Sequence, residues 1–182
     1  VIVQVETWLG VLVLGLFAPP AVVGLFGMAR GLTRSVKLVE YAASHSFLPT
    51  STALLRQGSA DVFLRFYVRT RTLAFALQWP VLAVCLFAPK FVMSTVFGPA
   101  YGSGNSALCL LAAAATVSSL VSTGKDQALV ALGRAKHVVA VEGSAVTATG
   151  VALLFLAPSY GARGAAIATL VGAAVHAGLL SW

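Results

Sequence analysis

Charged residues are scarce in this 182-residue chain, since only 9% of its residues are Asp, Glu, Lys or Arg, against about 25% in an average soluble domain. Hydrophobic residues make up 59% of the chain. With so few charged side chains, a soluble fold would expose a largely apolar surface to water. The composition therefore excludes an ordinary soluble domain. It indicates an all-α membrane protein, because helices satisfy their own backbone groups in lipid.

Acidic residues are the rarest charges, with five Asp and Glu against twelve Lys and Arg. The basic residues are spread over short polar segments and do not form one patch interleaved with aromatic residues, which argues against a nucleic-acid partner. We expect anionic membrane lipids and membrane topology to account for the positive charge.

The sequence has only two cysteines and no recognisable catalytic motif. Cys85 and Cys109 each lie in an apolar run without a second ligand at metal spacing, so we interpret both as buried thiols and expect no metal, disulfide or cofactor. There is no GxSxG, HExxH or Walker loop and no acidic pair at catalytic spacing in the polar segments, so we expect that the chain is not an enzyme. Residues 1–18 lack an initiator Met, a basic n-region and a cleavage site, which favours an internal or C-terminal part of a longer protein.

Apolar stretches follow one another along the chain, separated by turns such as APPA at 18–21 and APSYGARG at 157–164. Most are long enough to cross about 30 Å of hydrocarbon as a helix. The sequence therefore predicts a polytopic six-transmembrane-helix bundle over residues 1–182, with helices at about 4–18, 20–47, 72–97, 104–124, 138–157 and 162–182. Pro80 and Pro89 are expected to kink the third helix.

Lys and Arg are unevenly distributed among the connections. Residues 49–71 hold four Arg, and residues 125–137 hold Lys125, Arg134 and Lys136, whereas the alternate connections hold only Arg163. Cytoplasmic loops carry the excess of Lys and Arg. We therefore expect a multi-pass protein of the cytoplasmic membrane whose two basic connections, and both chain ends, face the cytoplasm.

The connection 49–71 alternates basic and apolar residues at helical spacing, the apolar ones including Leu55, Val62, Phe63, Phe66 and Tyr67. This pattern favours a short helix lying on the inner membrane surface, held by anionic headgroups and by its apolar side. A solvated linker is the other interpretation that the pattern leaves open.

A charged segment, MARGLTRSVKLVEYAASH at 28–45, interrupts the apolar pattern. On a helix, one side of this segment carries a set that we name the cationic stripe: Arg30, Arg34, Lys37, Tyr41 and, slightly further round, His45. The opposite side is apolar and consists of Leu32, Val36, Val39 and Ala43. The helix can thus turn an apolar side to lipid or to other helices while its cations face elsewhere.

A charge at the centre of a membrane helix costs about 2.5–3.5 kcal/mol on insertion scales, so three cations on one face need water or anionic partners. Arg and Lys match the charge of a diphosphate, and Arg adds forked hydrogen-bond donors. We expect the stripe to line a wet cavity and to bind the diphosphate of a lipid-linked substrate. The alternative is a solvated face partly outside the bilayer, with Glu40 screening Lys37.

Further candidates for ion coupling are Glu6, Glu142 and His176. Either carboxylate can pair with a cation of the stripe or carry a coupling proton, although interfacial carboxylates are the plainer interpretation. His176 is in register with Gly164, Ala168 and Gly172, a face of small residues that lets helices approach closely. We interpret it as a packing-face histidine, with a proton relay as the alternative.

Three ordered stretches resemble motifs of a known family: LFAPKFVMSTVFGPAY at 86–101, ALVALGRAKH at 128–137 and APSYGARGAAIATLVG at 157–172. Together with the opening ETWLGVLVLGLFAPPAVVGLFGMARGL, they are similar to the C-terminal half of the polysaccharide biosynthesis flippases, members of the multidrug, oligosaccharidyl-lipid and polysaccharide exporter superfamily. The likeness is carried mainly by turns and helix contacts, including Pro89, Gly98, Gly133 and Gly161, which do not identify the substrate.

The resemblance implies one lobe of a two-lobe transporter that flips undecaprenyl-diphosphate-linked saccharides, a class of polyprenyl-diphosphate-linked glycans, for polysaccharide biosynthesis and export. It also implies an N-terminal six-helix lobe as a partner beside membrane lipids, because alternating access needs two bundles around one site. Two alternatives are a cation antiporter of the same superfamily, which predicts an acidic cavity, and a non-transporting membrane module of a glycan assembly complex. An enzyme acting on isoprenoid phosphates would have only Glu40 and His45 near the stripe as acid and base.

Overall fold

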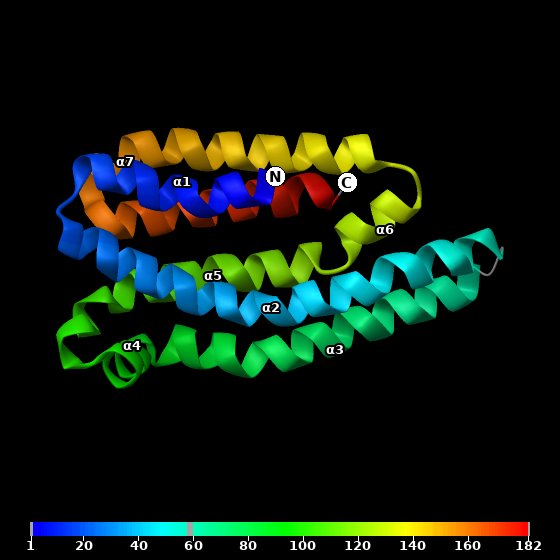
Figure 1. Cartoon of the computed structure of the whole chain (residues 1–182), viewed down its shortest axis with the longest axis horizontal. Coiled ribbons are helices and arrows are strands. Elements are labelled where there is room, and N and C mark those ends of the chain that lie inside the picture. The colour runs from blue at the N-terminus through cyan, green and yellow to red at the C-terminus, as the bar shows by residue number, and fades with distance from the viewer. Residues whose placement is uncertain (1, 58–59, 182) are drawn as a thin grey trace.

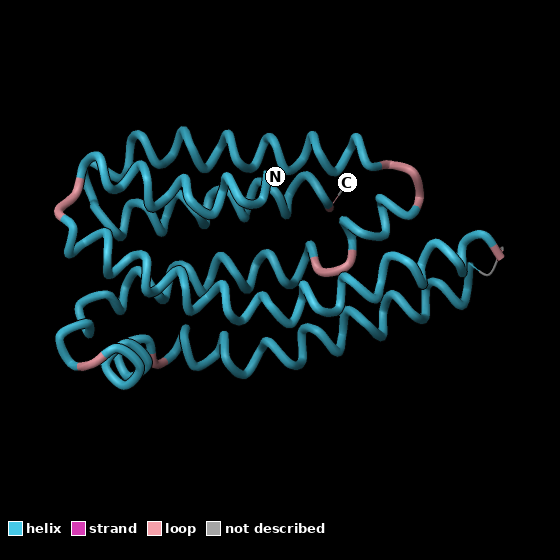
Figure 2. Tube along the Cα trace, in the orientation of Figure 1, coloured by secondary structure: helices cyan, strands magenta, loops and turns pink. Residues whose placement is uncertain are grey.

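The computed structural model describes residues 2–57 and 60–181, without the side chains of residues 2–7, 39–41 and 43–46. Short turns apart, this part of the chain is helical throughout, which confirms the predicted all-α class (Figure 2). In chain order the described elements are α1 (Ile2–Phe17), α2 (Pro20–Arg56), α3 (Ala60–Phe87), α4 (Pro89–Phe97), the 3-10 helix η1 (Pro99–Gly104), α5 (Asn105–Ser122), α6 (Lys125–Ala131) and α7 (Ala135–Leu180).

Most of the helices lie side by side along the long axis of the molecule (Figure 1). α1 packs on α7, and α5 packs on α7, α2 and α3, so α5 is central in the bundle. The main core between these helices includes the fully buried side chains of Leu14, Phe26, Met93, Leu108 and Leu153. Buried alanines fill much of the remaining core, which allows the helices to approach closely.

α7 consists of two helical arms that meet at Gly161, whose φ of 54° and ψ of −131° are not helical. The chain reverses its direction at this point, at the left of Figure 1. Glycine adopts a positive φ without steric cost, and Pro158, just before it, removes a backbone donor from the helix. The predicted break between residues 157 and 162 is therefore confirmed.

The two arms of α7 pack on each other through small residues. A Cβ atom at Gly172 would overlap Thr149 Oγ1 and lie 3.2 Å from the carbonyl oxygen of Ala145. Near the reversal, a Cβ atom at Gly164 would overlap the carbonyl group of Leu156. The face of small residues predicted for the second arm is confirmed, because only glycine fits at these two contacts.

The expected third helix is interrupted near its end. α3 stops at Phe87, Ala88 has a non-helical φ of −130° and ψ of 47°, and α4 begins with Pro89 as its first residue. Proline disfavours a helical conformation of the residue before it, so the chain turns here. α4 runs across the direction of the other helices and is seen end-on in Figure 1. The prediction of one kinked helix over 72–97 is wrong at Pro89, whereas Pro80 lies inside α3.

α2 and α3 extend through most of the connection 49–71 and form a hairpin that projects beyond the other helices (Figure 1). An aromatic cluster joins them: the ring of Phe47 stacks on Phe66 at 5.4 Å between centroids and meets Tyr67 edge-on at 6.0 Å. These rings pack against one another between α2 and α3. Within residues 49–57 and 60–71 there is no separate surface helix, so that prediction is wrong.

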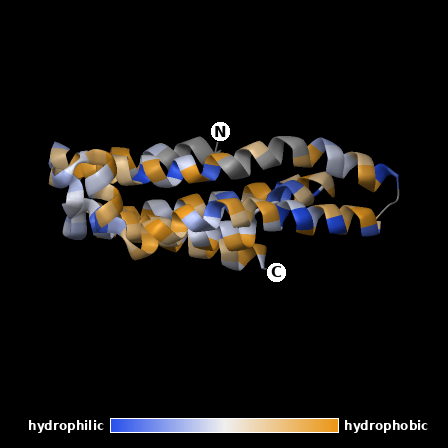
Figure 3. Ribbon diagram, turned by 90° about the horizontal axis from the view of Figure 1, so that it is seen from below, coloured by the Kyte–Doolittle hydropathy of each residue, from blue (hydrophilic) through white to orange (hydrophobic). Residues whose placement is uncertain are grey.

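Many large apolar side chains lie on the outside of the bundle. In Figure 3 hydrophobic residues recur along the bundle, and hydrophilic residues occur near the tip of the α2–α3 hairpin and at places along the rest of it. Large apolar side chains such as Phe87, 82% exposed, and Phe155, 75% exposed, are mostly uncovered by other parts of the described chain. Three described stretches are long and apolar enough to cross a membrane: Ala60–Phe87, Pro99–Ala131 and Ala135–Leu180. A shorter apolar helix covers Trp8–Phe17, and α2 is not among the candidates. The chain is a multi-pass membrane protein by these criteria.

Candidate functional site

The rotation of α2 is set by its buried face, which consists of Phe26, Ala29, Thr33 and Val36 at intervals of three and four residues. Val36 belongs to a small cluster shared with α3 and α5. Arg30, Arg34 and Lys37 each directly follow a residue of this face. The stripe therefore runs along the edge of the buried face, between the packed and the open side of α2.

Among the described side chains of the stripe, Arg30 makes contacts inside the bundle. Its Nη1 donates a hydrogen bond to Thr169 Oγ1 of α7 at 3.1 Å, and its guanidinium carbon lies 5.9 Å from the centre of the Phe26 ring. On the side of α1, a Cβ atom at Gly10 would lie 3.6 Å from the same Nη1. Arg30 is thus half-buried where α1, α2 and the second arm of α7 meet.

The next two cations differ in exposure. Arg34 is exposed and Lys37 is half-buried. Open space lies one turn before Arg34 on α2, because nothing is found within 4 Å of a Cβ atom placed at Gly31. The stripe therefore passes from the interior of the bundle at Arg30 to an open flank at Arg34.

The distance of each cation from the start of α2 bears on its depth in a bilayer. With a rise of about 1.5 Å per residue, Arg30, Arg34 and Lys37 lie about 15, 21 and 26 Å along the axis from Pro20. The hydrocarbon core of a bilayer is about 30 Å thick. If α2 starts near one membrane surface, all three cations fall within that thickness.

The other predicted site residues are placed less completely. Tyr41 and His45 of the stripe lie outside the described side chains, as do Glu6 and Glu40. Glu142 is half-buried on the first arm of α7. On the second arm, His176 Nδ1 is 2.9 Å from Ser122 Oγ at the end of α5, which agrees with a packing-face position.

Two polar features were missed by the sequence interpretation. Thr169, the partner of Arg30, lies in an apolar run and is 139 residues away along the chain. Gln78 and Ser119 form a buried pair between α3 and α5, in which Ser119 Oγ donates to Gln78 Oε1 at 2.8 Å. A lone Gln in the apolar stretch 73–87 was the only signal for the second feature, and nothing signalled the first.

These features define a class: an all-α, multi-pass membrane protein with a cationic side chain held inside its helix bundle. Within that class, the chain is 26% identical over 167 residues to the probable flippase AglR of Haloferax volcanii. The alignment covers 91% of this chain and 35% of AglR, so the chain spans about a third of the length of this relative. No protein-family model and no solved structure matches the chain.

The resemblance to flippases stated from the ordered motifs is confirmed by this distant similarity. A flippase is a transporter, so the similarity also agrees with the expectation that the chain is not an enzyme. The chain is thus a membrane protein with a distant similarity to a probable flippase. The geometry of the stripe supplies a more specific hypothesis.

Proposed function

We propose that this chain forms one lobe of a transporter of the cytoplasmic membrane that flips a polyprenyl-diphosphate-linked saccharide for polysaccharide biosynthesis or export. α1, α2, α3, α5 and the two arms of α7 are its six spans. A second helical bundle completes the transport path, because alternating access requires two bundles that rock around a shared site.

The observation that carries the proposal is the position of Arg30. A guanidinium at bilayer depth is expensive, and such residues usually face an internal cavity or a substrate path. Its contacts with Thr169 and Phe26 hold it at a junction of three helices, with Arg34 and Lys37 further along the same side. A diphosphate is the lipid-linked group that best matches several cations in a row and the forked donors of Arg.

Flipping is the direct test of the stripe. In the intact protein reconstituted into liposomes, the triple variant R30Q/R34Q/K37Q is expected to reduce the flipping of a fluorescent polyprenyl-diphosphate saccharide to the protein-free rate. Flipping is measured by quenching with a reductant that does not cross the membrane. The matched control removes three positive charges from the α2–α3 tip, as R56Q/R65Q/R69Q, and should retain flipping. A triple stripe variant that flips at the unmodified rate would contradict the proposal.

The substitution Arg30→Lys separates charge from geometry. Lysine keeps the positive charge but lacks the forked donors, so flipping should fall about tenfold while Arg30→Gln abolishes it. Equal activity of the Lys variant and the unmodified protein would show that Arg30 contributes charge alone.

The orientation can be tested independently of transport. The two basic connections lie at one end of the bundle, and the turns near Ser103 and Ser159 lie at the other (Figure 1). By the excess of Lys and Arg, the basic end and both chain ends face the cytoplasm. In a C85A/C109A background, a cysteine at exposed Lys136 should react with an impermeant maleimide only in inverted vesicles, and one at Ser103 or Ser159 only in right-side-out vesicles. The reverse pattern would invert the topology.

A further inference from the structure

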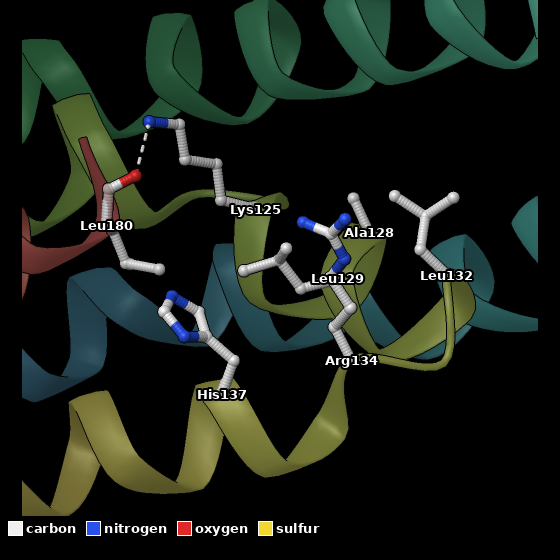
Figure 4. Close-up of a pocket in the computed structure, with 7 residues that line it drawn as sticks. All are labelled: Lys125, Ala128, Leu129, Leu132, Arg134, His137 and Leu180. Atoms are coloured by element: carbon white, nitrogen blue, oxygen red, sulfur yellow. Dashed lines mark hydrogen bonds between the residues drawn. The ribbon is translucent and has the colours of Figure 1, made fainter. Parts of the chain in front are cut away.

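A second basic feature lies far from Arg30 along the chain, where α6 and both ends of α7 meet. A cavity of about 630 Å³ is lined there by Lys125, Ala128, Leu129, Leu132, Arg134, His137 and Leu180 (Figure 4). Three of these seven described residues bear basic side chains, the others are apolar, and none is acidic. The lining thus combines a cationic part with a part made of leucines.

The turn at Gly133 places Arg134 at the mouth of this cavity. Gly133 has a φ of 79°, its N–H donates to the Val130 carbonyl at 3.0 Å, and the N–H of Arg134 donates to the Leu129 carbonyl at 2.8 Å. These two bonds form the Schellman motif that ends α6, and a positive φ at this position favours glycine. Arg134 is therefore fixed as the residue that begins α7.

Lys125 approaches the same cavity from the other side. As the first residue of α6, it donates from Nζ to the carbonyl oxygen of Leu180 at 3.1 Å, in the last turn of α7 (Figure 4). A lysine at a helix C-terminus is favourable because its charge faces the negative end of the helix dipole. His137 lies in the first turn of α7 and completes the basic side.

The depth of the cavity follows from the helices that build it. Pro99–Ala131 and Ala135–Leu180 are two of the candidate membrane spans, and the cavity lies at their ends. The ends of membrane-spanning helices lie at the level of the lipid headgroups. Leu129, Leu132 and Leu180 therefore offer an apolar wall next to the position where acyl chains begin.

We propose that this cavity binds the phosphate of an anionic glycerophospholipid, at a site distinct from the cationic stripe. Lys125 and Arg134 neutralise the phosphate, His137 donates a hydrogen bond to it, and the three leucines contact the upper part of the acyl chains. A lipid is the source of the phosphate rather than a free anion, because a soluble phosphate would leave the leucine wall without a partner. The site does not depend on transport by the stripe.

The test uses the intact protein purified in a neutral detergent, with phosphatidylglycerol as the probe and phosphatidylcholine and inorganic phosphate as the comparison ligands. Binding is measured by native mass spectrometry. The variant K125Q/R134Q should weaken phosphatidylglycerol binding at least about tenfold, since each charge-assisted hydrogen bond contributes more than a neutral one. The matched control, R65Q/R69Q on the α2–α3 hairpin, should leave it unchanged.

Two further variants keep the result interpretable. Arg134→Gln alone leaves the contact between Lys125 and Leu180 in place and should weaken binding on its own, and Lys125→Arg keeps the charge and should bind normally. Equal losses in K125Q/R134Q and R65Q/R69Q would overturn the proposal in favour of general surface charge. Inorganic phosphate that displaces the lipid at millimolar concentration would overturn the assignment of a lipid as the ligand.

Discussion

Gly172 is the residue at which the packing of α7 can be tested most sharply. Substitution by alanine places a Cβ atom in overlap with Thr149 Oγ1 and 3.2 Å from the Ala145 carbonyl oxygen. Thr149 is buried, and its hydroxyl donates to that carbonyl at 2.9 Å, so rotating it away breaks a buried hydrogen bond. Overpacking costs about 1–3 kcal/mol, and the better helix propensity of alanine returns about 1 kcal/mol. We expect a net loss of up to about 2 kcal/mol.

The matched control is Gly143→Ala in the first arm of the same helix, where nothing lies within 4 Å of the added Cβ atom. This variant should gain stability by about 0.5–1 kcal/mol from helix propensity alone. Thermal unfolding in detergent can be followed by maleimide labelling of Cys85, which is 1% exposed, in a C109A background. At about 2–4 °C per kcal/mol, the Tm should fall by a few degrees for G172A and rise slightly for G143A.

A second substitution tests whether the overlap with Thr149 causes the loss of stability in Gly172→Ala. Adding Thr149→Ala to Gly172→Ala removes the overlapping hydroxyl, so the double variant should unfold at a higher temperature than Gly172→Ala alone. If Gly172→Ala is as stable as Gly143→Ala, the two arms of α7 are not packed backbone against backbone and the reasoning fails.

Three further predictions concern other contacts. Ser119→Ala leaves Gln78 Oε1 without its donor and should lower the free energy of unfolding by about 1 kcal/mol, whereas the double variant Q78L/S119A should lower it less. A double-mutant cycle, measured by unfolding in detergent, gives the difference. Additive effects of the two substitutions would contradict the pairing. Gly133→Ala forces a φ of 79° on alanine, at a cost of about 1–2 kcal/mol, and should speed hydrogen exchange in α6; unchanged exchange would argue against the Schellman turn. Phe47→Ala removes a buried ring that stacks on Phe66 and should destabilise the hairpin by about 3 kcal/mol. Trypsin should then cleave the tip of the hairpin faster. Unchanged cleavage would show that the aromatic cluster does not stabilise the hairpin.

Local patterns predicted the parts of the fold that depend on near neighbours. The turn around Gly161 was visible as APSYGARG, and the spacing of Gly164, Ala168 and Gly172 indicated the face on which the arms pack. Hydrophobicity identified apolar helices because lipid demands it of every exposed helix face, and three described stretches are long and apolar enough to cross a membrane. These signals act over one or two helical turns, and the structure agrees with them.

Where several distant segments meet, the sequence left the outcome open. Phe63, Phe66 and Tyr67 could face a membrane surface or another helix, and the presence of Phe47 across the hairpin decided between these interpretations. Pro89 marked a disturbance, but whether the helix kinks or ends there depends on what packs around Ala88. These choices are decided by tertiary contacts, which local periodicity does not report.

In the candidate site, too, features that depend on near neighbours were predictable and contacts between distant segments were not. The direction of the stripe on α2 was predictable, because helical spacing alone puts Arg30, Arg34 and Lys37 on one side. The contact of Arg30 with Thr169 was not, because the two residues lie on helices that the chain brings together only after several reversals. The basic cavity around Lys125 combines residues of a turn with the last turn of α7, and the sequence alone indicates only a role in membrane topology for Lys125 and Arg134.

Arg30 and Phe47 lie on the same uninterrupted length of α2, about 26 Å apart along its axis. Arg30 is hydrogen-bonded to α7 and Phe47 stacks on α3, so this stretch of helix is held at two points by different neighbouring helices. A tilt of about 5° around Arg30 would move the aromatic cluster by about 2 Å. A displacement of the Arg30 guanidinium that tilts α2 would therefore also move the tip of the hairpin. No part of α2 would have to unfold to transmit this movement.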